Sequence, residues 1–156
     1  IFSMDEFNLL LDTSESGVSW YEGGLHQKME DLNGDGVKEY NGWKHFWDLV
    51  GVCSTCRKPP RKIMCFDSQA YVDCTKKFPA LLQKDLNESR KRLRSSTKYF
   101  REHIDSFHTE LIFFISTSVN LNKKEETLDY IKTNFSQETF DWVKENMDKI
   151  LKELDS

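Results

Sequence analysis

The stretch "PALLQKDLNESRKRLRSSTKYFREHIDSFHTELIFFISTS", residues 79–118, decides the fold class of this chain. Large apolar side chains recur in it every seven residues, and they are Leu86, Leu93, Phe100, Phe107 and Phe114. This spacing places them along one face of a helix, and proline is favoured at a first helical position such as Pro79. We therefore predict one long amphipathic helix over about 79–118, which needs partners along its length.

Shorter helices are predicted on both sides of this segment. After it, Asn122 is expected to cap one helix, with Glu125 completing a capping box, and Ser136 is expected to cap another. The apolar stripe of the last helix consists of Phe140, Val143, Met147, Ile150, Leu151 and Leu154. Residues 3–12 are predicted to form a further short helix that begins with a capping box. The predicted fold class is therefore mainly α, a helical bundle.

The 156 residues are predicted to form a single domain with two parts of different character. Residues 1–76 are expected to form an acidic lobe, irregular or built on a β-hairpin and clasped by disulfides, and residues 77–156 the helical part. The middle of the chain is basic, because residues 51–101 hold thirteen Lys/Arg and four Asp/Glu. This basic region either docks on the acidic parts of the same chain or binds an acidic partner.

All four cysteines lie within 22 residues, at Cys53, Cys56, Cys65 and Cys74. Their even number favours two disulfides, for which four cysteines allow three pairings. A zinc site usually combines two close pairs, whereas eight residues separate the second pair here. A redox pair usually begins a helix of a thioredoxin-like unit, whereas two prolines soon follow this one. We predict disulfides, with zinc binding, redox chemistry and free thiols as the alternatives.

Disulfides indicate an extracellular location, because they persist in oxidising compartments. Two N-x-S sequences, at Asn87 and Asn134, suit N-glycosylation of such a protein. No apolar run approaches the roughly 20 residues that a membrane-spanning helix needs, and the first residues show no signal-peptide pattern. We therefore predict a secreted chain, already processed or trimmed, without a transmembrane segment.

The segment "DLNGDGVKEY", residues 31–40, places side-chain oxygens at alternate positions and follows them with a glycine. Calcium binds six to eight oxygens, and a loop that wraps it needs such alternate ligands and a sharp turn at its sixth residue. The expected ligands are the side chains of Asp31, Asn33, Asp35 and Glu39 and the backbone carbonyl of Val37. An EF-hand is excluded, because its twelfth position holds glycine here instead of glutamate. The alternative is an empty hairpin turn, which Asn-Gly and Asp-Gly also favour.

This segment resembles the calcium loop of FG-GAP repeats, which occur in integrin α-subunits and related propellers. Asp31, Asn33, Gly34, Asp35 and Gly36 match the pattern of that loop, and Glu39 replaces its usual aspartate. In that family the loop joins two strands. A single copy implies a local calcium loop and no propeller, since a propeller needs several blades. Without a bidentate glutamate, we expect weak binding, at about 10⁻⁴ to 10⁻³ M.

A basic stripe is predicted on the long helix. Arg90, Arg94, Lys98 and Arg101 recur at helical spacing, on the side opposite Leu93 and Phe100. Such a stripe indicates either a solvated helix face or a site for an acidic protein, a sulfated glycan or an anionic lipid headgroup. Nucleic acid is not expected, because the chain carries a net charge of −4 and no aromatic residue alternates with the basic ones.

The sequence holds no recognisable catalytic motif, whether G-x-S-x-G, H-E-x-x-H or a phosphate-binding glycine loop. We therefore predict a non-enzymatic binding protein whose partner is a protein or an anionic glycan. The alternative is a carrier that holds small apolar ligands between aromatic-rich helices. Its candidate lining residues are Phe100, Phe107, Phe113, Phe114, Phe140 and Trp142.

Overall fold

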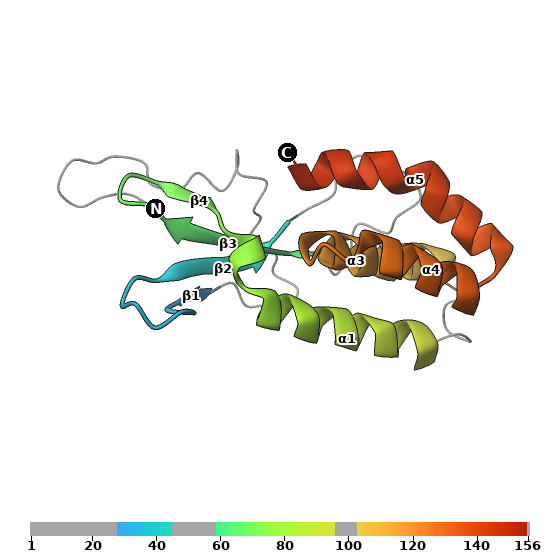
Figure 1. The fold of residues 1–156 in the computed structure, drawn as a ribbon, viewed down its shortest axis with the longest axis horizontal. Coiled ribbons are helices and arrows are strands. Elements are labelled where there is room, and N and C mark those ends of the chain that lie inside the picture. The colour runs from blue at the N-terminus through green and yellow to red at the C-terminus, as the bar shows by residue number, and fades with distance from the viewer. Residues whose placement is uncertain (1–27, 45–58, 96–102, 156) are drawn as a thin grey trace. The chain divides into compact units, whose positions relative to one another are not determined.

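The structure is a computed structural model that describes residues 28–44, 59–95 and 103–155 (Figure 1). In these ranges the chain is mainly helical, with four α-helices and one four-stranded antiparallel sheet. None of these helices is long and apolar enough to cross a bilayer. The predicted helix over residues 3–12 lies outside the described residues.

The described residues divide into two compact units. The sheet unit comprises residues 28–44 and 61–77, and the helical unit comprises residues 78–95 and 103–155 together with 59–60. The acidic loop that resembles a calcium site belongs to the sheet unit, and the basic stripe belongs to the helical unit. Each unit is therefore described separately.

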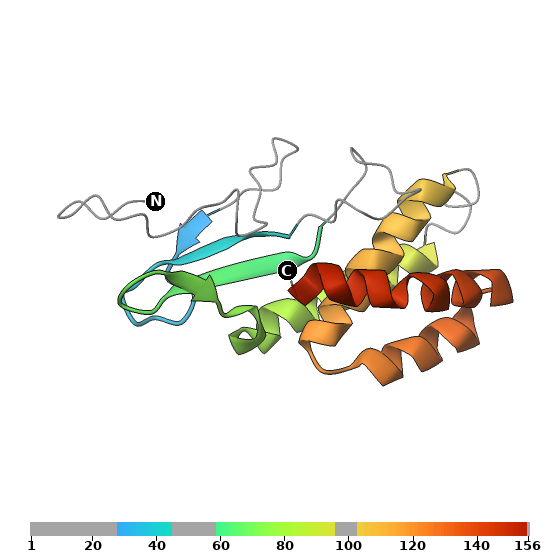
Figure 2. The same ribbon diagram turned by 90° about the horizontal axis from the view of Figure 1, so that it is seen from above.

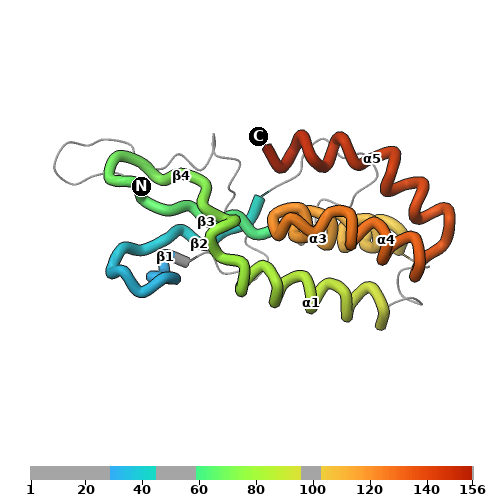
Figure 3. The backbone as a smooth tube through the Cα atoms, viewed as in Figure 1, coloured from blue at the N-terminus to red at the C-terminus, as the bar shows by residue number. Residues whose placement is uncertain are grey.

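The sheet unit is built on four strands in the order β1-β2-β3-β4, so each strand pairs with its neighbours in sequence (Figures 2 and 3). The strands are β1 (Lys28–Glu30), β2 (Glu39–Trp43), β3 (Arg61–Phe66) and β4 (Tyr71–Asp73), followed by a 3₁₀ helix, η1 (Thr75–Lys77). Tyr40 lies opposite Met29 on one side and Met64 on the other. Tyr40 and Met64 are buried, and Tyr71 packs against them, which makes this sheet face a small core.

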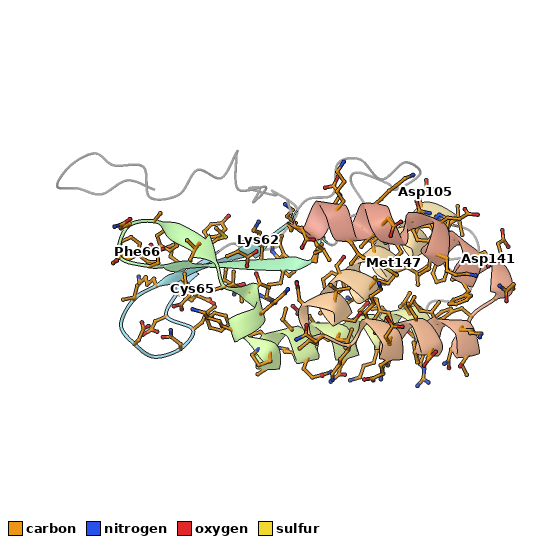
Figure 4. All side chains as sticks on the ribbon, turned by 45° about the horizontal axis from the view of Figure 1, so that its top comes forward. Lys62, Cys65, Phe66, Asp105, Asp141 and Met147 are labelled. Atoms are coloured by element: carbon orange, nitrogen blue, oxygen red, sulfur yellow. A yellow bond between two sulfur atoms is a disulfide. The ribbon has the colours of Figure 1, made fainter. Side chains whose placement is uncertain are left out.

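A disulfide joins Cys65 on β3 to Cys74, which directly follows β4, and their Cα atoms are 5.7 Å apart (Figure 4). The backbone N–H of Cys74 donates a hydrogen bond of 2.9 Å to the carbonyl of Ile63, so the crosslink closes the β3–β4 hairpin. The predicted disulfide chemistry is thus confirmed for this pair, and such a crosslink fits an extracellular protein. Cys53 and Cys56 lie outside the described residues.

The buried phenol of Tyr40 predicts how the sheet unit responds to alkali. Burial raises the pKa of Tyr40 to about 12 from an unfolded value of 10.0. Because the folded pKa is the higher one, this group stabilises the fold fully below pH 10, and that contribution is lost as the pH rises toward 12. We expect a loss of about 2 to 3 kcal/mol over this interval. Urea denaturation at pH 9 and pH 11.5 measures it, and an unchanged pH dependence in Tyr40→Phe would contradict the assignment.

The helical unit packs around its most apolar helix. Its helices are α1 (Pro79–Ser95), α3 (Ile104–Asn120), α4 (Lys124–Asn134) and α5 (Gln137–Asp155). Helix α3 contacts the other three helices, and the stretch from Thr109 to Ser118 is buried throughout, as expected for a helix that is apolar on all sides. The buried core consists of Leu86, Leu93, Phe107, Leu111, Ile112, Phe114, Ile115, Ile131, Val143, Met147 and Ile150.

The predicted single helix over about 79–118 is not what the structure shows. Two helices, α1 and α3, cover this stretch and pack against each other, and α3 runs back along α1 (Figures 1 and 2). Ser89 on α1 donates a hydrogen bond of 2.5 Å to Glu110 on α3, whereas one straight helix would separate these residues by about 30 Å. The seven-residue repeat continues across the reversal because both helices bury the same apolar row in one core.

Two of the predicted helix caps lie in the described residues, and they differ in outcome. The cap at Ser136 is confirmed, because its Oγ accepts a hydrogen bond of 3.2 Å from the backbone N–H of Thr139 in the first turn of α5. The cap at Asn122 is wrong, since this residue has a φ of +57° and belongs to the end of α3. Its N–H and that of Lys123 bond back to carbonyls of the last turn of α3, which is the Schellman arrangement that asparagine tolerates in the left-handed conformation.

Candidate functional site

Asp31 organises the loop between β1 and β2 through both of its carboxylate oxygens. Oδ1 accepts a hydrogen bond of 2.7 Å from the N–H of Gly34, and Oδ2 accepts one of 3.0 Å from the N–H of Gly36. Both glycines have positive φ values, +82° and +88°, a region that glycine adopts more readily than any other residue. The loop therefore joins two strands and turns at the glycines that the sequence places there.

Carboxylate oxygens converge on Asn33 inside this loop. Its Nδ2 donates hydrogen bonds to Asp35 Oδ2 at 2.9 Å and to Glu39 Oε1 at 3.3 Å. Glu39 is only 2% exposed, and its other oxygen accepts a bond of 2.7 Å from the N–H of Leu32. Asp35 Oδ1 accepts a bond from the N–H of Val37. Two carboxylates thus point toward one donor, and backbone N–H groups hold both in place.

The fit of this loop to calcium is partial. Among the described residues, no group of three or more His, Cys, Asp or Glu side chains is placed so that it could hold a metal ion. Calcium also accepts amide and carbonyl oxygens as ligands, so Asn33 and the carbonyl of Val37 remain candidates beside Asp35 and Glu39. To serve as a ligand, Asn33 must turn its amide oxygen toward the two carboxylates, where its nitrogen now lies.

Helix α1 exposes a narrow basic face to solvent. Its exposed residues beyond the first turn are Lys84, Asn87, Lys91, Arg94 and Ser95. At 100° per residue, the four from Lys84 to Arg94 fall within an arc of about 80°, opposite the buried Leu86 and Leu93. Among the residues that the structure describes, no carboxylate forms an ion pair with Lys84, Lys91 or Arg94. This set is called the α1 basic face below.

The predicted basic stripe included Arg90, and the structure places this residue differently. Its guanidinium carbon lies 4.6 Å from the ring centroid of Tyr130 on α4, and its Nη2 lies 3.8 Å from Glu126. Its Nε is buried. Arg90 is thus engaged in packing α1 against α4. Arg94 is exposed, and its guanidinium carbon lies farther from the same ring, at 5.6 Å from the centroid. Lys98 and Arg101 lie outside the described residues.

A polar network between α1 and α3 was not anticipated from the sequence. The guanidinium of Arg92 donates two hydrogen bonds to the carboxylate of Glu110, at 2.8 and 2.9 Å, and Ser89 donates a third. Glu110 is 8% exposed, so its charge depends on these donors. The only signal in the sequence was a glutamate, Glu110, beside the apolar run of residues 111–115.

The aromatic residues proposed to line a carrier site mostly fill the core. Phe113 and Phe114 are fully buried, and Phe100 lies outside the described residues. His108 stacks on the Trp142 ring of α5 with centroids 3.9 Å apart. Burial lowers the pKa of His108, against the opposing attraction of the carboxylates of Asp105 and Glu138.

The two predicted glycosylation sequences lie in different settings. Asn87 belongs to the α1 basic face, and its Oδ1 accepts a hydrogen bond of 3.0 Å from Gln83. Asn134 ends α4, and its Nδ2 donates a bond of 2.9 Å to the carbonyl of Tyr130. Both asparagines are exposed, so neither position is closed to a glycan by packing.

Comparisons with known proteins give no match to a family model, a curated protein or a solved structure. The function is therefore inferred from the residues of this chain. Among the residues that the structure describes, the two candidate binding features are the acidic loop of residues 31–39 and the α1 basic face. The acidic loop offers oxygen ligands to a metal cation, and the α1 basic face offers positive charges to an anionic ligand.

Proposed function

We propose that this chain is an extracellular, non-enzymatic binding protein whose α1 basic face docks a sulfated glycan. The observation that carries the proposal is the sign of the charge on that face, where three cations lie beside Asn87. The acid at its edge, Glu88, is paired with Arg92 on the same helix, with charged atoms 3.9 Å apart. The exposed face of α5 differs, because it carries both signs of charge, on Lys144, Glu145, Asp148 and Lys149. A face of one sign attracts a polyanion, whereas a mixed face is neutral to it.

The cations of this face are available to a ligand, unlike the other arginines of α1. Arg92 is bonded to Glu110, and Arg90 lies beside Glu126. Within the described residues, no carboxylate competes for Lys84, Lys91 or Arg94. An incoming sulfate group therefore displaces water and counterions and breaks no ion pair, although the guanidinium carbon of Arg94 lies 5.6 Å from the ring centroid of Tyr130.

The shape and composition of the face favour a glycan over a protein partner. Lys84 and Lys91 are separated by about 10 Å along the helix axis, so the charges form a line that a linear polyanion can follow. Stable protein interfaces depend on buried aromatic or apolar anchors, and the exposed residues of the face include none. An acidic protein surface is the competing partner.

Retention on immobilised heparin tests this function. We expect the full chain to be retained at about 0.15 M salt, although its net charge is −4. Hyaluronan, which carries carboxylates and no sulfates, is the control matrix and should retain it less. Passage through heparin without retention would contradict the proposal, and equal retention on both matrices would show that sulfate is not recognised.

Calcium binding by the loop of residues 31–39 is the second part of the proposal. Its support is the convergence of Asp35 and Glu39 on one point and the resemblance of the loop to the FG-GAP calcium loop. A cation there would neutralise carboxylates that now share one amide donor, so its role is to stabilise the β1–β2 hairpin. Weak binding suits an extracellular module, where calcium is abundant.

Calcium is expected to stabilise the wild-type chain and to stabilise Asp35→Asn much less. At 10 mM calcium and a dissociation constant of 10⁻⁴ to 10⁻³ M, the gain in unfolding free energy is about 1.4 to 2.7 kcal/mol. Asp35→Asn removes a charge and keeps an oxygen for the N–H of Val37, so the turn survives. Urea denaturation with calcium or chelator measures the difference. An equal response of both proteins, or none in either, would contradict calcium binding here.

A further inference from the structure

Asn87 lies within the α1 basic face, between its cations. Lys84 precedes it by three residues and Lys91 follows it by four, and residues at these spacings are neighbours on a helix, with Cβ atoms about 5 to 6 Å apart. All three side chains are exposed. A group attached to Asn87 therefore occupies the surface between Lys84 and Lys91, where a bound polyanion would lie.

We propose that an N-linked glycan on Asn87 blocks the α1 basic face. Only copies of this chain without that glycan would then bind the sulfated ligand. This inference rests on the proposed function. The glycan is bulky and hydrated, and it shields Lys84 and Lys91 without changing their charge. The face thus has two alternative states, one covered by the glycan of the chain and one open to a sulfated glycan.

The third residue of the sequon fixes when the modification occurs. Ser89 is fully buried, and its Oγ donates a hydrogen bond of 2.5 Å to Glu110 across the α1–α3 contact. An enzyme that reads the Ser89 hydroxyl reaches it only before α1 packs against α3. Occupancy of Asn87 is therefore set during synthesis, and folded chains without the glycan retain an open face.

The chemistry of the step is an amide N-glycosylation from a lipid-pyrophosphate-linked oligosaccharide. The Asn87 side-chain nitrogen forms a bond to the anomeric carbon of the donor sugar. The bond from that carbon to the lipid pyrophosphate breaks, its electron pair leaves with the pyrophosphate, and the amide releases one proton. The asparagine keeps its neutral amide, so the effect on binding is steric shielding.

Asn134 provides a matched control, because it has the same N-x-S pattern and belongs to the same unit. It lies at the end of α4 and is not part of the α1 basic face. A glycan there adds similar mass and hydration. Any general effect of glycosylation on solubility or column behaviour is therefore reproduced at Asn134 without covering Lys84 or Lys91.

The experiment uses the full chain secreted from a glycosylating cell line as wild type, Asn87→Gln and Asn134→Gln, with intact mass reporting glycan occupancy. Affinity for a heparin oligosaccharide is then measured by titration. We expect Asn87→Gln to bind at least tenfold more tightly than the wild type, and Asn134→Gln to bind as the wild type does.

Two results overturn the inference while the proposed function stands: absence of a glycan on Asn87 in the wild type, or equal affinities of an occupied wild type and Asn87→Gln. Failure of Asn87→Gln itself to bind heparin overturns the proposed function, and the inference falls with it. Both asparagines are exposed, so neither substitution removes a core contact, and far-UV circular dichroism verifies that each variant is folded.

Discussion

Replacing Arg92 by leucine is expected to lower the unfolding free energy of the helical unit by about 3 kcal/mol. The arginine supplies two of the three hydrogen bonds that the buried carboxylate of Glu110 receives. Without it, a charge that is 8% exposed keeps only the hydroxyl of Ser89. The loss lies at the lower end of the range for broken buried pairs, because the Arg92 side chain is 34% exposed and water partly replaces it.

Urea denaturation followed by far-UV circular dichroism measures this loss. Arg94→Leu is the matched control, because it removes an exposed charge from the same helix and should change stability by less than about 0.5 kcal/mol. In Arg92→Leu/Glu110→Gln the buried charge is gone and Ser89 keeps an acceptor, so part of the stability should return. Equal losses in Arg92→Leu and Arg94→Leu would show that the network contributes nothing specific.

Reversing the charge of the α1 basic face is expected to weaken heparin binding by about a hundredfold. The variant Lys84→Glu/Lys91→Glu/Arg94→Glu loses three exposed ionic contacts, each worth about 1 kcal/mol at most, and about 3 kcal/mol corresponds to that factor. Repulsion between the new carboxylates and the sulfates adds to the loss. Titration of the chain produced without glycans measures the change.

The control for this variant is a charge reversal of equal size on another helix. Lys144→Glu/Lys149→Glu/Lys152→Glu changes the net charge by the same amount on the exposed side of α5. Its effect on affinity should stay below tenfold, because salt screens charges beyond about 10 Å. If both triple variants lost the same affinity, net charge alone would govern binding and the α1 basic face would have no special role.

Local patterns in the sequence predicted those features that neighbouring residues decide. The apolar stripe of α5 and its Ser136 cap follow from residues a few positions apart, and both are present. The glycines at 34 and 36 indicated a sharp turn, and both have positive φ. The clustered cysteines indicated a crosslinked lobe, and Cys65 is bonded to Cys74.

Features that depend on tertiary packing were missed. The heptad from Leu86 to Phe114 has no break in period, so it did not reveal that α1 and α3 are two helices that bury one core. The predicted basic stripe began at Arg90, because spacing alone does not show that Tyr130 of α4 lies against this residue. Because α4 lies against Arg90, the exposed cations of α1 are Lys84, Lys91 and Arg94, which form the α1 basic face.

The proposed binding site for the sulfated glycan is tested most directly by nuclear magnetic resonance on the isotope-labelled full chain, which is produced without N-linked glycans. A heparin hexasaccharide is titrated in, and amide shifts are followed to saturation. The account predicts that the largest shift changes occur at Lys84, Asn87, Lys91 and Arg94. Changes centred on α5 or on the sheet unit, or none at saturating ligand, would contradict it.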